Sequence, residues 1–544
     1  MDTNPGSLKP SHWIEALEKG RLAGQFEQNL GRDSRLVEEH RGLALQALRT
    51  FAGEFGDDRP VVIVRSPGRI NLIGMHVDHR GFPVNPVAVK ETVVVASARD
   101  DDRVNLVNVK EQFVARSFRI SRELPTRPVE DWDDWTARNL EELARQGLSG
   151  DWSNYARAPG CYFANLLWKE RGQSPASFKG LDAAVASNMP MAVGLSSSSA
   201  LVVSMALLFC RFNGIETEAS ELIDHCGIAE WFVGTRGGKG DHAAILLGRQ
   251  GRITHIEFFP FSVRYLSFPA EYRVVVCNSL LLSRKGAAMR HAFNERIAGY
   301  EIGFLLLKKI LEKYGVDPSR LFRLRDLAPD SLGLDDRTLL EALLELPERI
   351  GRGKVERQLG ASHGETLRKL WQTHPEPEGG YPVRDVCLFG IAEGQRSRMA
   401  ASLLENGRIE QFGRIMNVSH DGDRVNCWQN GVGSPWASTF NRATLENLDK
   451  AESLLHYRPG GYRVSTPEID RLVDIALATE GVLGARLTGA GYGGCVVVLC
   501  HQAAVDRLID RLGKEYYSPT GQATAAEVCQ PLAGANFFQE PPPG

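Results

Sequence analysis

The chain has 544 residues, of which 43% are hydrophobic and 24% are charged, and its formal net charge is −3. This length is typical of two to four domains, and a charge so near zero argues against a nucleic-acid-binding protein, which usually carries a basic excess. There is no apolar run of about 18 residues and no basic-then-apolar N-terminus, so we expect neither a membrane span nor a secretory signal. Nine singly spaced cysteines fit free thiols and a cytoplasmic location.

The first half of the chain alternates predicted helices and strands. Apolar spacing from Ser34 to Phe55 predicts an amphipathic helix, and the polar residues before it have no clear role. Runs rich in β-branched residues predict strands at 61–64, 84–97, 104–107, 253–258 and 272–277. Alternation predicts another strand at 116–120, and 182–187 is a short strand candidate that leads to the serines. Helices are expected from residue 200 to 209 and from 218 to 231.

The second half is mainly helical by pattern. Helices are expected at 287–313, 389–406 and 408–419, and Thr466 with Pro467 predicts a capped helix start. A strand, a glycine loop and a second strand follow at 484–499. The charged segment 315–385 and the Gly/Pro-rich segment 422–461 are expected to be insertions. The mixture predicts an α+β protein with no internal repeat.

Three glycine-rich stretches, at 65–78, 191–200 and 487–495, are the most informative feature. In the middle one, a glycine and four serines open an apolar helical run, and the N–H groups of a helix N-terminus favour an anion. No Gly-Lys-Ser/Thr follows, so the pattern is not a P-loop, and no stretch fits the Rossmann fingerprint. Together the three stretches indicate an enzyme that uses a nucleotide.

In order and spacing the three stretches resemble the GHMP kinase superfamily, and the first is similar to the galactokinase signature. Pro67 to Gly74 (PGRINLIG) is the common part, and His76-Val-Asp78 stands at the family's His-x-Asp. Shorter segments at 152–155, 277–279, 462–470 and 521–535 also have counterparts, so the resemblance spans about residues 36–537.

The resemblance implies a two-domain GHMP kinase fold with its active site in the cleft between the domains. The expected parts are an N-terminal extension (1–35), an N-terminal domain (36–266) and a C-terminal domain (267–537) that contains both insertions. ATP and Mg²⁺ are the implied cofactors. The implied partners are a small-molecule sugar and ATP, with no nucleic acid and no membrane. The pattern predicts no oligomeric state.

The resemblance places the ATP phosphates on Gly194, Leu195, Ser196, Ser197, Ser198 and Ser199. Ser197 is the expected magnesium contact, because magnesium prefers hard oxygen ligands. An ordinary helix cap is the alternative, although four serines exceed what a cap needs. Glu230 resembles the family's second magnesium-linked carboxylate. One residue fewer than in the family separates it from Gly234, and in a helix such a deletion rotates a side chain by about 100°.

Asp241, in the turn Gly237-Gly-Lys-Gly-Asp, matches the family's proposed catalytic base. Beside a sugar hydroxyl, its carboxylate could accept a proton as the oxygen attacks the γ-phosphorus. Arg69 matches the arginine implied to hold that aspartate and to offset phosphoryl charge. The alternatives are a turn aspartate and a surface salt bridge.

The sugar-binding residues that the resemblance implies are Met75, His76, Asp78, Gly238 and Phe293. Three positions depart from the family: Met75 replaces a Glu, His79 a Tyr, and Phe293 the Tyr of a Tyr-Asn-x-Arg segment. Replacing a carboxylate with a thioether removes an acceptor for a galactose 6-hydroxyl. It would also remove the repulsion of a C6 carboxylate, which His79, Arg80 or Arg290 could then pair with.

The expected activity is that of an ATP-dependent sugar 1-kinase of galactokinase type, with galactose or a C6-altered sugar as substrate. Galacturonate is one such sugar, which would make the protein a galacturonokinase, and a pentose such as arabinose is another. A second hypothesis is a catalytically silent relative that senses sugar and ATP; the retained Arg69 and Asp241 count against it. A kinase for a non-sugar alcohol such as mevalonate is a third, and His76-x-Asp78 counts against that.

Overall fold

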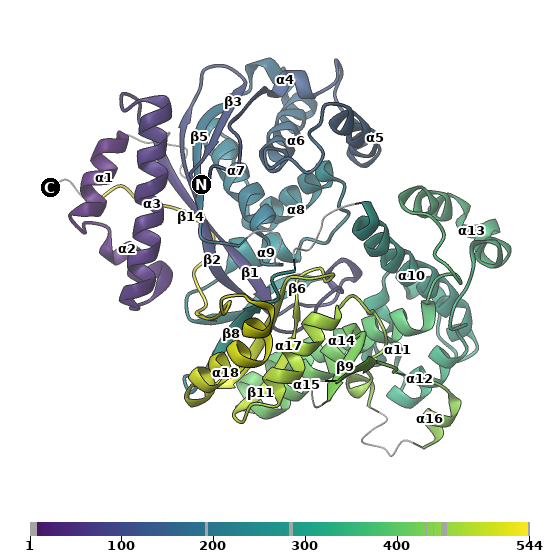
Figure 1. Ribbon diagram of the computed structural model, residues 1–544. Helices are drawn as coiled ribbons and strands as arrows, with labels where there is room; N and C mark the ends of the chain where they lie inside the picture. The colour runs from purple at the N-terminus through teal and green to yellow at the C-terminus, as the bar shows by residue number, and fades with distance from the viewer. Residues whose placement is uncertain are drawn as a thin grey trace.

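The structure is a computed structural model that describes residues 8–190, 194–281, 287–429, 432–438, 440–447 and 454–541. Helices and strands are interspersed along the chain, as the predicted α+β class requires. Most strands fall into two sheets, which occupy different halves of the molecule (Figure 1).

The first sheet has six strands in the order β14-β1-β2-β5-β3-β4, antiparallel except for the β3–β5 pair. Its strands are β1 (Val62–Asn71), β2 (Pro86–Ala98), β3 (Arg103–Asn108), β4 (Arg116–Arg119), β5 (Leu181–Ser187) and β14 (Asn536–Phe537). The predicted strands in this region are confirmed. β1 runs on through the first glycine-rich stretch, with a register shift at Pro67/Gly68.

Helices cover both faces of the first sheet (Figure 1). On one face lie α1 (Pro10–Glu18), α2 (Ala23–Leu30) and α3 (Ser34–Phe55), which pack on Ile63, Val93 and Val95. The other face, with Val62 and Val64, is packed by α6 (Asn154–Arg171) and α7 (Ser197–Phe212). Alternate residues of a strand point to opposite faces, so one strand contributes to two cores. Four further helices of this half are α4 (Ile120–Glu123), α5 (Trp132–Arg145), α8 (Ala219–Ala229) and α9 (Gly240–Leu247).

The predicted helix from Ser34 to Phe55 is confirmed, and its start is explained by Asp33. The Asp33 carboxylate accepts hydrogen bonds from the N–H groups of Arg35 and Leu36, which caps α3. The residues before it also have a structural role, because Trp13 and Phe26 are buried in the same core.

The second sheet is antiparallel in the order β11-β12-β8-β13. Its strands are β8 (Tyr272–Asn278), β11 (Val482–Thr488), β12 (Cys495–His501) and β13 (Ala526–Cys529). The helices packed around it are α10 (Ala287–Glu312), α14 (Val383–Glu405), α15 (Ile409–Asp423), α17 (Pro467–Leu477) and α18 (Val505–Leu512). One buried cluster joins this sheet to the first, because Val276 and Val497 pack together with Ile70 and Val87.

The two predicted insertions contain regular structure. Residues 315–385 form α11 (Pro329–Leu332), α12 (Asp336–Leu344) and α13 (Arg352–Thr373). Residues 422–461, expected to be a long loop, include the hairpin β9 (Asn426–Gln429) and β10 (Val432–Pro435) and the short helix α16 (Arg442–Glu446). A further hairpin, β6 (Arg252–Phe258) and β7 (Phe261–Ser267), follows α9; its second strand was not predicted, because most of its residues are exposed.

The chain returns to the first sheet at its C-terminal side, where Phe537 pairs with Val64 and Asn536 with Arg65. Residues on both sides of the predicted boundary at 266/267 therefore belong to one sheet. The boundary itself stays a prediction.

Candidate active site

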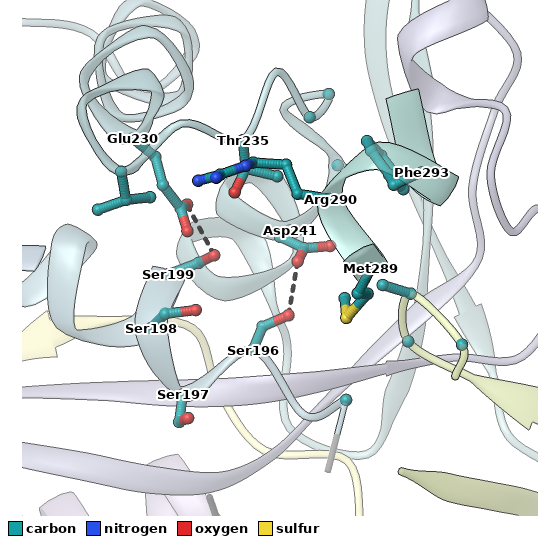
Figure 2. A pocket seen from close by; sticks show the side chains of 18 of the residues that line it. Ser196, Ser197, Ser198, Ser199, Glu230, Thr235, Asp241, Met289, Arg290 and Phe293 are labelled. Atoms are coloured by element: carbon teal, nitrogen blue, oxygen red, sulfur yellow. Dashed lines mark hydrogen bonds between the residues drawn. The ribbon is translucent and has the colours of Figure 1, made fainter. Parts of the chain in front are cut away.

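One pocket of about 410 Å³ gathers the residues for which the sequence predicted a role (Figure 2). These residues are Arg69, Met75, His76, Asp78, Gly194, Leu195, Ser196, Ser197, Ser198, Ser199, Glu230, Gly238, Asp241 and Phe293. They come from β1, the loop after it, the serine loop, the 3₁₀ turn Glu230–Val233 after α8, the Asp241 turn and α10. Met191 to Val193 of the second stretch lie outside the described residues.

The serine loop forms the N-terminus of α7. Ser196 has a left-handed conformation (φ 58°, ψ 40°), and the first helical hydrogen bond runs from the N–H of Ala200 to the Ser196 carbonyl. The amides of residues 197–199 thus precede the hydrogen-bond ladder and lie at the positive end of the helix dipole. No serine side chain caps the helix, so the ordinary-cap alternative is not what the structure shows. The loop is suited to bind phosphate.

The second and third glycine-rich stretches contact one another backbone to backbone. Gly194 (φ +83°) and Gly489 (φ +90°) face each other so closely that a Cβ added to Gly489 would lie 2.6 Å from the Gly194 Cα. Only glycine combines these φ angles with this approach. The third stretch therefore shapes the serine loop, and Gly489, Ala490, Gly491 and Gly493 line the pocket.

Arg69 and Asp241, 172 residues apart, form a two-pronged ion pair inside the pocket. Arg69 Nε donates to Asp241 Oδ1 and Nη2 to Oδ2, both at 2.7 Å, and Nη1 donates to the Gly194 carbonyl at 2.7 Å. Ser196 Oγ adds a third donor to Asp241 at 2.5 Å (Figure 2). Since the Arg69 side chain is 10% exposed, this pair is not a surface salt bridge. It fixes the carboxylate beside the serine loop.

Glu230 faces the serine loop, and its partner there is Ser199. Ser199 Oγ donates to Glu230 Oε2 at 2.9 Å, and His242 Nε2 lies 2.7 Å from the same oxygen. Ser197 lines the pocket, but Figure 2 shows its hydroxyl pointing away from Glu230. The geometry therefore favours Ser199 over the predicted Ser197 as the hydroxyl beside this carboxylate, because residues two apart on a helix lie about 200° around its axis.

Met75 and His76 form the wall nearest the C-terminal half. The Gly74 and Met75 N–H groups donate to Glu393 Oε1 at 2.8 and 3.0 Å, which fixes the backbone, and Met75 is 5% exposed. The His76 ring stacks on Tyr462 with a 4.4 Å centroid separation. This wall is closely packed and largely apolar.

Asp78 lies opposite, against the turn that carries Asp241. Its Oδ2 accepts a hydrogen bond from the Gly240 N–H at 3.1 Å, and Gly238 packs directly on its carboxylate. Burial by itself would raise the pKa of Asp78, but the hydrogen bond and charge of His79 and the N–H groups of Gly240 and His79 outweigh it and lower that pKa to about 2. Burial lowers the pKa of His79. At neutral pH Asp78 is thus a carboxylate.

Some residues at the site were not predicted. His242, directly after Asp241, lies behind the pocket wall and supports Glu230, and Leu140 and Leu143 of α5 with Tyr155 of α6 line the pocket. The only sequence signal for these lining residues was the resemblance of segment 152–155. Arg290, named only as a possible partner of a C6 carboxylate, lies on α10 and extends towards Thr235 and Glu230 (Figure 2).

Comparison with known proteins agrees with this geometry. Three family models match the chain: the galactokinase galactose-binding signature at residues 49–99, the GHMP kinase N-terminal domain at 154–249 and the GHMP kinase C-terminal domain at 436–518. A galactokinase of Chloroflexus aurantiacus is 28% identical over 479 residues, covering 88% of this chain and 93% of that protein. A galactokinase of Roseiflexus sp. (strain RS-1) is 27% identical over 476 residues, covering 87% and 92%.

Among solved structures, Lactococcus lactis galactokinase complexed with galactose has the same fold. Its TM-score is 0.59 at 22% identity, covering 90% of this chain and 98% of that one. In fold and in domain content the chain matches GHMP kinases. Within that superfamily it is similar to galactokinases, because its sugar-binding signature and the relatives that it matches over most of their length are those of galactokinases.

Proposed function

We propose that the protein is an ATP-dependent galactose 1-kinase, which transfers the γ-phosphoryl group of ATP to the anomeric hydroxyl of the sugar. One observation carries this proposal. The Arg69–Asp241 pair lies in one pocket with a helix N-terminus suited to phosphate and with His76 and Asp78, which belong to the galactose-binding signature. A hydroxyl acceptor and a phosphoryl donor can therefore meet at this pair.

In the proposed reaction, the first turn of α7 holds the ATP phosphates and Asp241 lies beside the attacking oxygen. The bond from this oxygen to the γ-phosphorus forms, the bond from that phosphorus to the β,γ-bridging oxygen breaks, and the hydroxyl proton passes to the Asp241 carboxylate. ADP leaves with the bridging oxygen. Arg69 orients Asp241 and offsets charge on the phosphoryl oxygens, so most of the acceleration comes from positioning and electrostatics.

A magnesium ion fits the pocket at Glu230 and Ser199, because both are hard oxygen donors on the pocket wall. When bound, the ion would offset negative charge on the ATP phosphates. The described residues contain no group of three or more His, Cys, Asp or Glu side chains suited to a metal. A site completed by phosphate oxygens needs no such group. His242 would hold the Glu230 carboxylate in place.

Galactose is the proposed sugar, because two of the three candidate partners for a C6 carboxylate are unsuited to pair with one. Burial lowers the pKa of His79, and its Nδ1 already contacts Asp78, while Arg80 Nη1 is paired with Glu301 at 2.8 Å. Arg290 alone remains, and it points towards Glu230 on the phosphate side of the pocket (Figure 2). A galacturonate kinase therefore has less support than a galactose kinase.

The test measures ADP release with ATP and Mg²⁺ against galactose, galacturonate, N-acetylgalactosamine and arabinose. We expect turnover with galactose and its loss in Asp241→Ala, with binding of a fluorescent ATP analogue retained within about threefold. Near-normal turnover of Asp241→Ala would remove that residue from the mechanism. Galactose binding without turnover in the unaltered protein would indicate a sensor instead of a kinase.

As to location, among the described residues no helix combines the length and apolar character needed to cross a membrane. The expected cytoplasmic location remains part of the proposal, and fractionation of cells that make the protein would test it.

A further inference from the structure

Two buried polar atoms that have no hydrogen-bond partner among the described residues face one another behind the pocket wall formed by Met75 and His76. His76 Nε2 and Asp423 Oδ1 are both shielded from solvent, and the distance between them is 3.5 Å. His76 lines the pocket, whereas Asp423, the last residue of α15, is fully buried and does not. A buried polar atom left unpaired is costly. These two atoms are therefore each other's natural partners.

Asp423 is held in place from its other side. Its Oδ2 lies 3.5 Å from Nη2 of Arg486, whose Nη1 is 3.0 Å from Glu393 Oε1. The Asp423 backbone carbonyl accepts a hydrogen bond from the N–H of Ser465 at 3.0 Å. The carboxylate therefore cannot turn away, and its free oxygen is fixed towards the imidazole.

This arrangement selects one tautomer of His76. A carboxylate oxygen only accepts hydrogen bonds, so the ring nitrogen that faces it must carry the hydrogen. In the neutral ring, a hydrogen on Nε2 leaves Nδ1 as an acceptor. Nδ1 is not among the shielded unpaired atoms, and no described residue donates to it. It is the ring atom that can meet a ligand in the pocket.

We infer that Asp423 is a positioning residue for sugar binding: it fixes the ring and the tautomer of His76, so that Nδ1 accepts a hydrogen bond from a sugar hydroxyl. Stacking on Tyr462 fixes the plane of the ring, and Asp423 fixes which nitrogen carries the hydrogen. The inference rests on the proposed function and adds to it a residue that never touches the substrate.

Asp423→Asn is the sharpest test, because it preserves shape and changes only hydrogen bonding. The amide oxygen is attracted to the Arg486 guanidinium, so the amide NH₂ faces His76 Nε2 and makes that atom the acceptor. Nδ1 then carries the hydrogen and no longer accepts one. We expect KM for galactose to rise at least tenfold, with kcat and KM for ATP within about threefold of the unaltered enzyme.

Asp470→Asn is the matched control. Asp470 forms a similar buried pair with His420, at 3.2 Å from Oδ1 to Nε2, and does not line the pocket. It should change the thermal unfolding temperature without changing KM for galactose. An equal rise of KM in both variants would mean that burial of a carboxylate, rather than its contact with His76, matters.

A double-mutant cycle then decides between positioning and general structure. In a His76→Ala background, Asp423→Asn should change KM for galactose less than twofold, because there is no ring left to orient. A tenfold effect that persists in that background would overturn the inference.

If Asp423→Asn fails to fold, two variants of His76 test the step on which the inference depends, namely that Nδ1 is the ring nitrogen that meets the sugar. Asn places its amide at the Nδ1 position and Gln places it at the Nε2 position, so His76→Asn should bind galactose more tightly than His76→Gln. The reverse order would overturn the inference. If the unaltered protein neither turns over galactose nor binds it, the proposed function and this inference are both overturned. If turnover is normal but the effects of the two substitutions in the double-mutant cycle simply add, the inference alone is overturned.

Discussion

Glu393 is wholly buried behind the pocket wall formed by Met75 and His76, and it accepts hydrogen bonds from five donors. The donors are the N–H groups of Gly74 and Met75, Ser419 Oγ, Arg396 Nε and Arg486 Nη1, at 2.7 to 3.0 Å. Burial would raise the pKa of Glu393, but the charges of the two arginines outweigh it and lower that pKa to about 2. We predict that Glu393→Gln, which changes little in shape, is strongly destabilising.

The magnitude follows from the contacts. Gln keeps one acceptor oxygen but turns Oε2 into an NH₂ group that faces the N–H of Arg396, so two buried guanidiniums lose their nearest counter-charge. Breaking a buried pair in this way costs about 3–5 kcal/mol. Unfolding entropy at this chain length is on the order of 1.1 kcal/mol per kelvin, so the melting temperature should fall by about 4 °C. KM for galactose should rise as well, because Glu393 holds the Met75 backbone.

The assay is urea and thermal unfolding, followed by tryptophan fluorescence and calorimetry. Glu405→Gln is the control, because Glu405 lies on the same helix, is half-exposed and makes only a 3.4 Å contact with Arg264. Loss of this exposed contact should lower the free energy of unfolding by less than about 0.5 kcal/mol. Should Glu393→Gln stay within 1 kcal/mol of the unaltered protein, the reasoning about this network is refuted.

Three further predictions concern the metal, the glycine contact and acid. Glu230→Gln should raise the Mg²⁺ concentration for half-maximal activity about tenfold and leave KM for galactose unchanged; an unchanged Mg²⁺ curve would speak against a metal role. Gly489→Ala should destabilise the protein more than Gly521→Ala does and should raise KM for ATP, because Gly489 combines a positive φ with a backbone clash, whereas Gly521, at φ +69° with open space around it, carries only the backbone strain of about 1–2 kcal/mol; equal melting temperatures of the two variants would contradict this. The pKa of Glu91, like that of Glu393, is about 2 in the folded state, because the charges of nearby basic groups outweigh burial. A pKa lowered by folding means that the unfolded chain takes up protons first, so stability present above about pH 4.5 should be lost as pH falls towards 2; urea unfolding from pH 6 to 3 checks it, and a flat profile would be inconsistent with it.

The sequence could predict which segments meet at the site, but not how their side chains face one another. Nothing in its spacing brings Arg69 within 2.7 Å of Asp241; that expectation came from the family resemblance. Local structure was more predictable, because the helix Ser34–Phe55 follows directly from apolar periodicity and its Asp33 cap. The pairing of Ser199 rather than Ser197 with Glu230 depends on the phase of α7, which four identical serines do not reveal.

Two further features lay outside sequence reasoning. The shortened segment after Glu230 left the direction of that side chain open. The chain there forms a tight 3₁₀ turn that ends at Gly234 with φ 89°, and Glu230 faces the pocket. The buried charges of Glu393 and Asp423 gave no signal at all. A charged residue in a helical pattern is normally read as solvated, and only the tertiary partners show otherwise.

The pairing of β14 with β1 has a consequence for synthesis. Val64 pairs with Phe537, so 473 residues must be added after the first partner before the second one exists. At a typical 5–20 residues per second, a ribosome needs roughly 25 to 95 s for that stretch. During this time the outer edge of β1 has no strand beside it, and an unpaired edge is a template for wrong pairing between chains. A nascent chain would therefore benefit from a chaperone at this edge, because α1–α3, which are made first, pack on a face of the same sheet rather than along its edge.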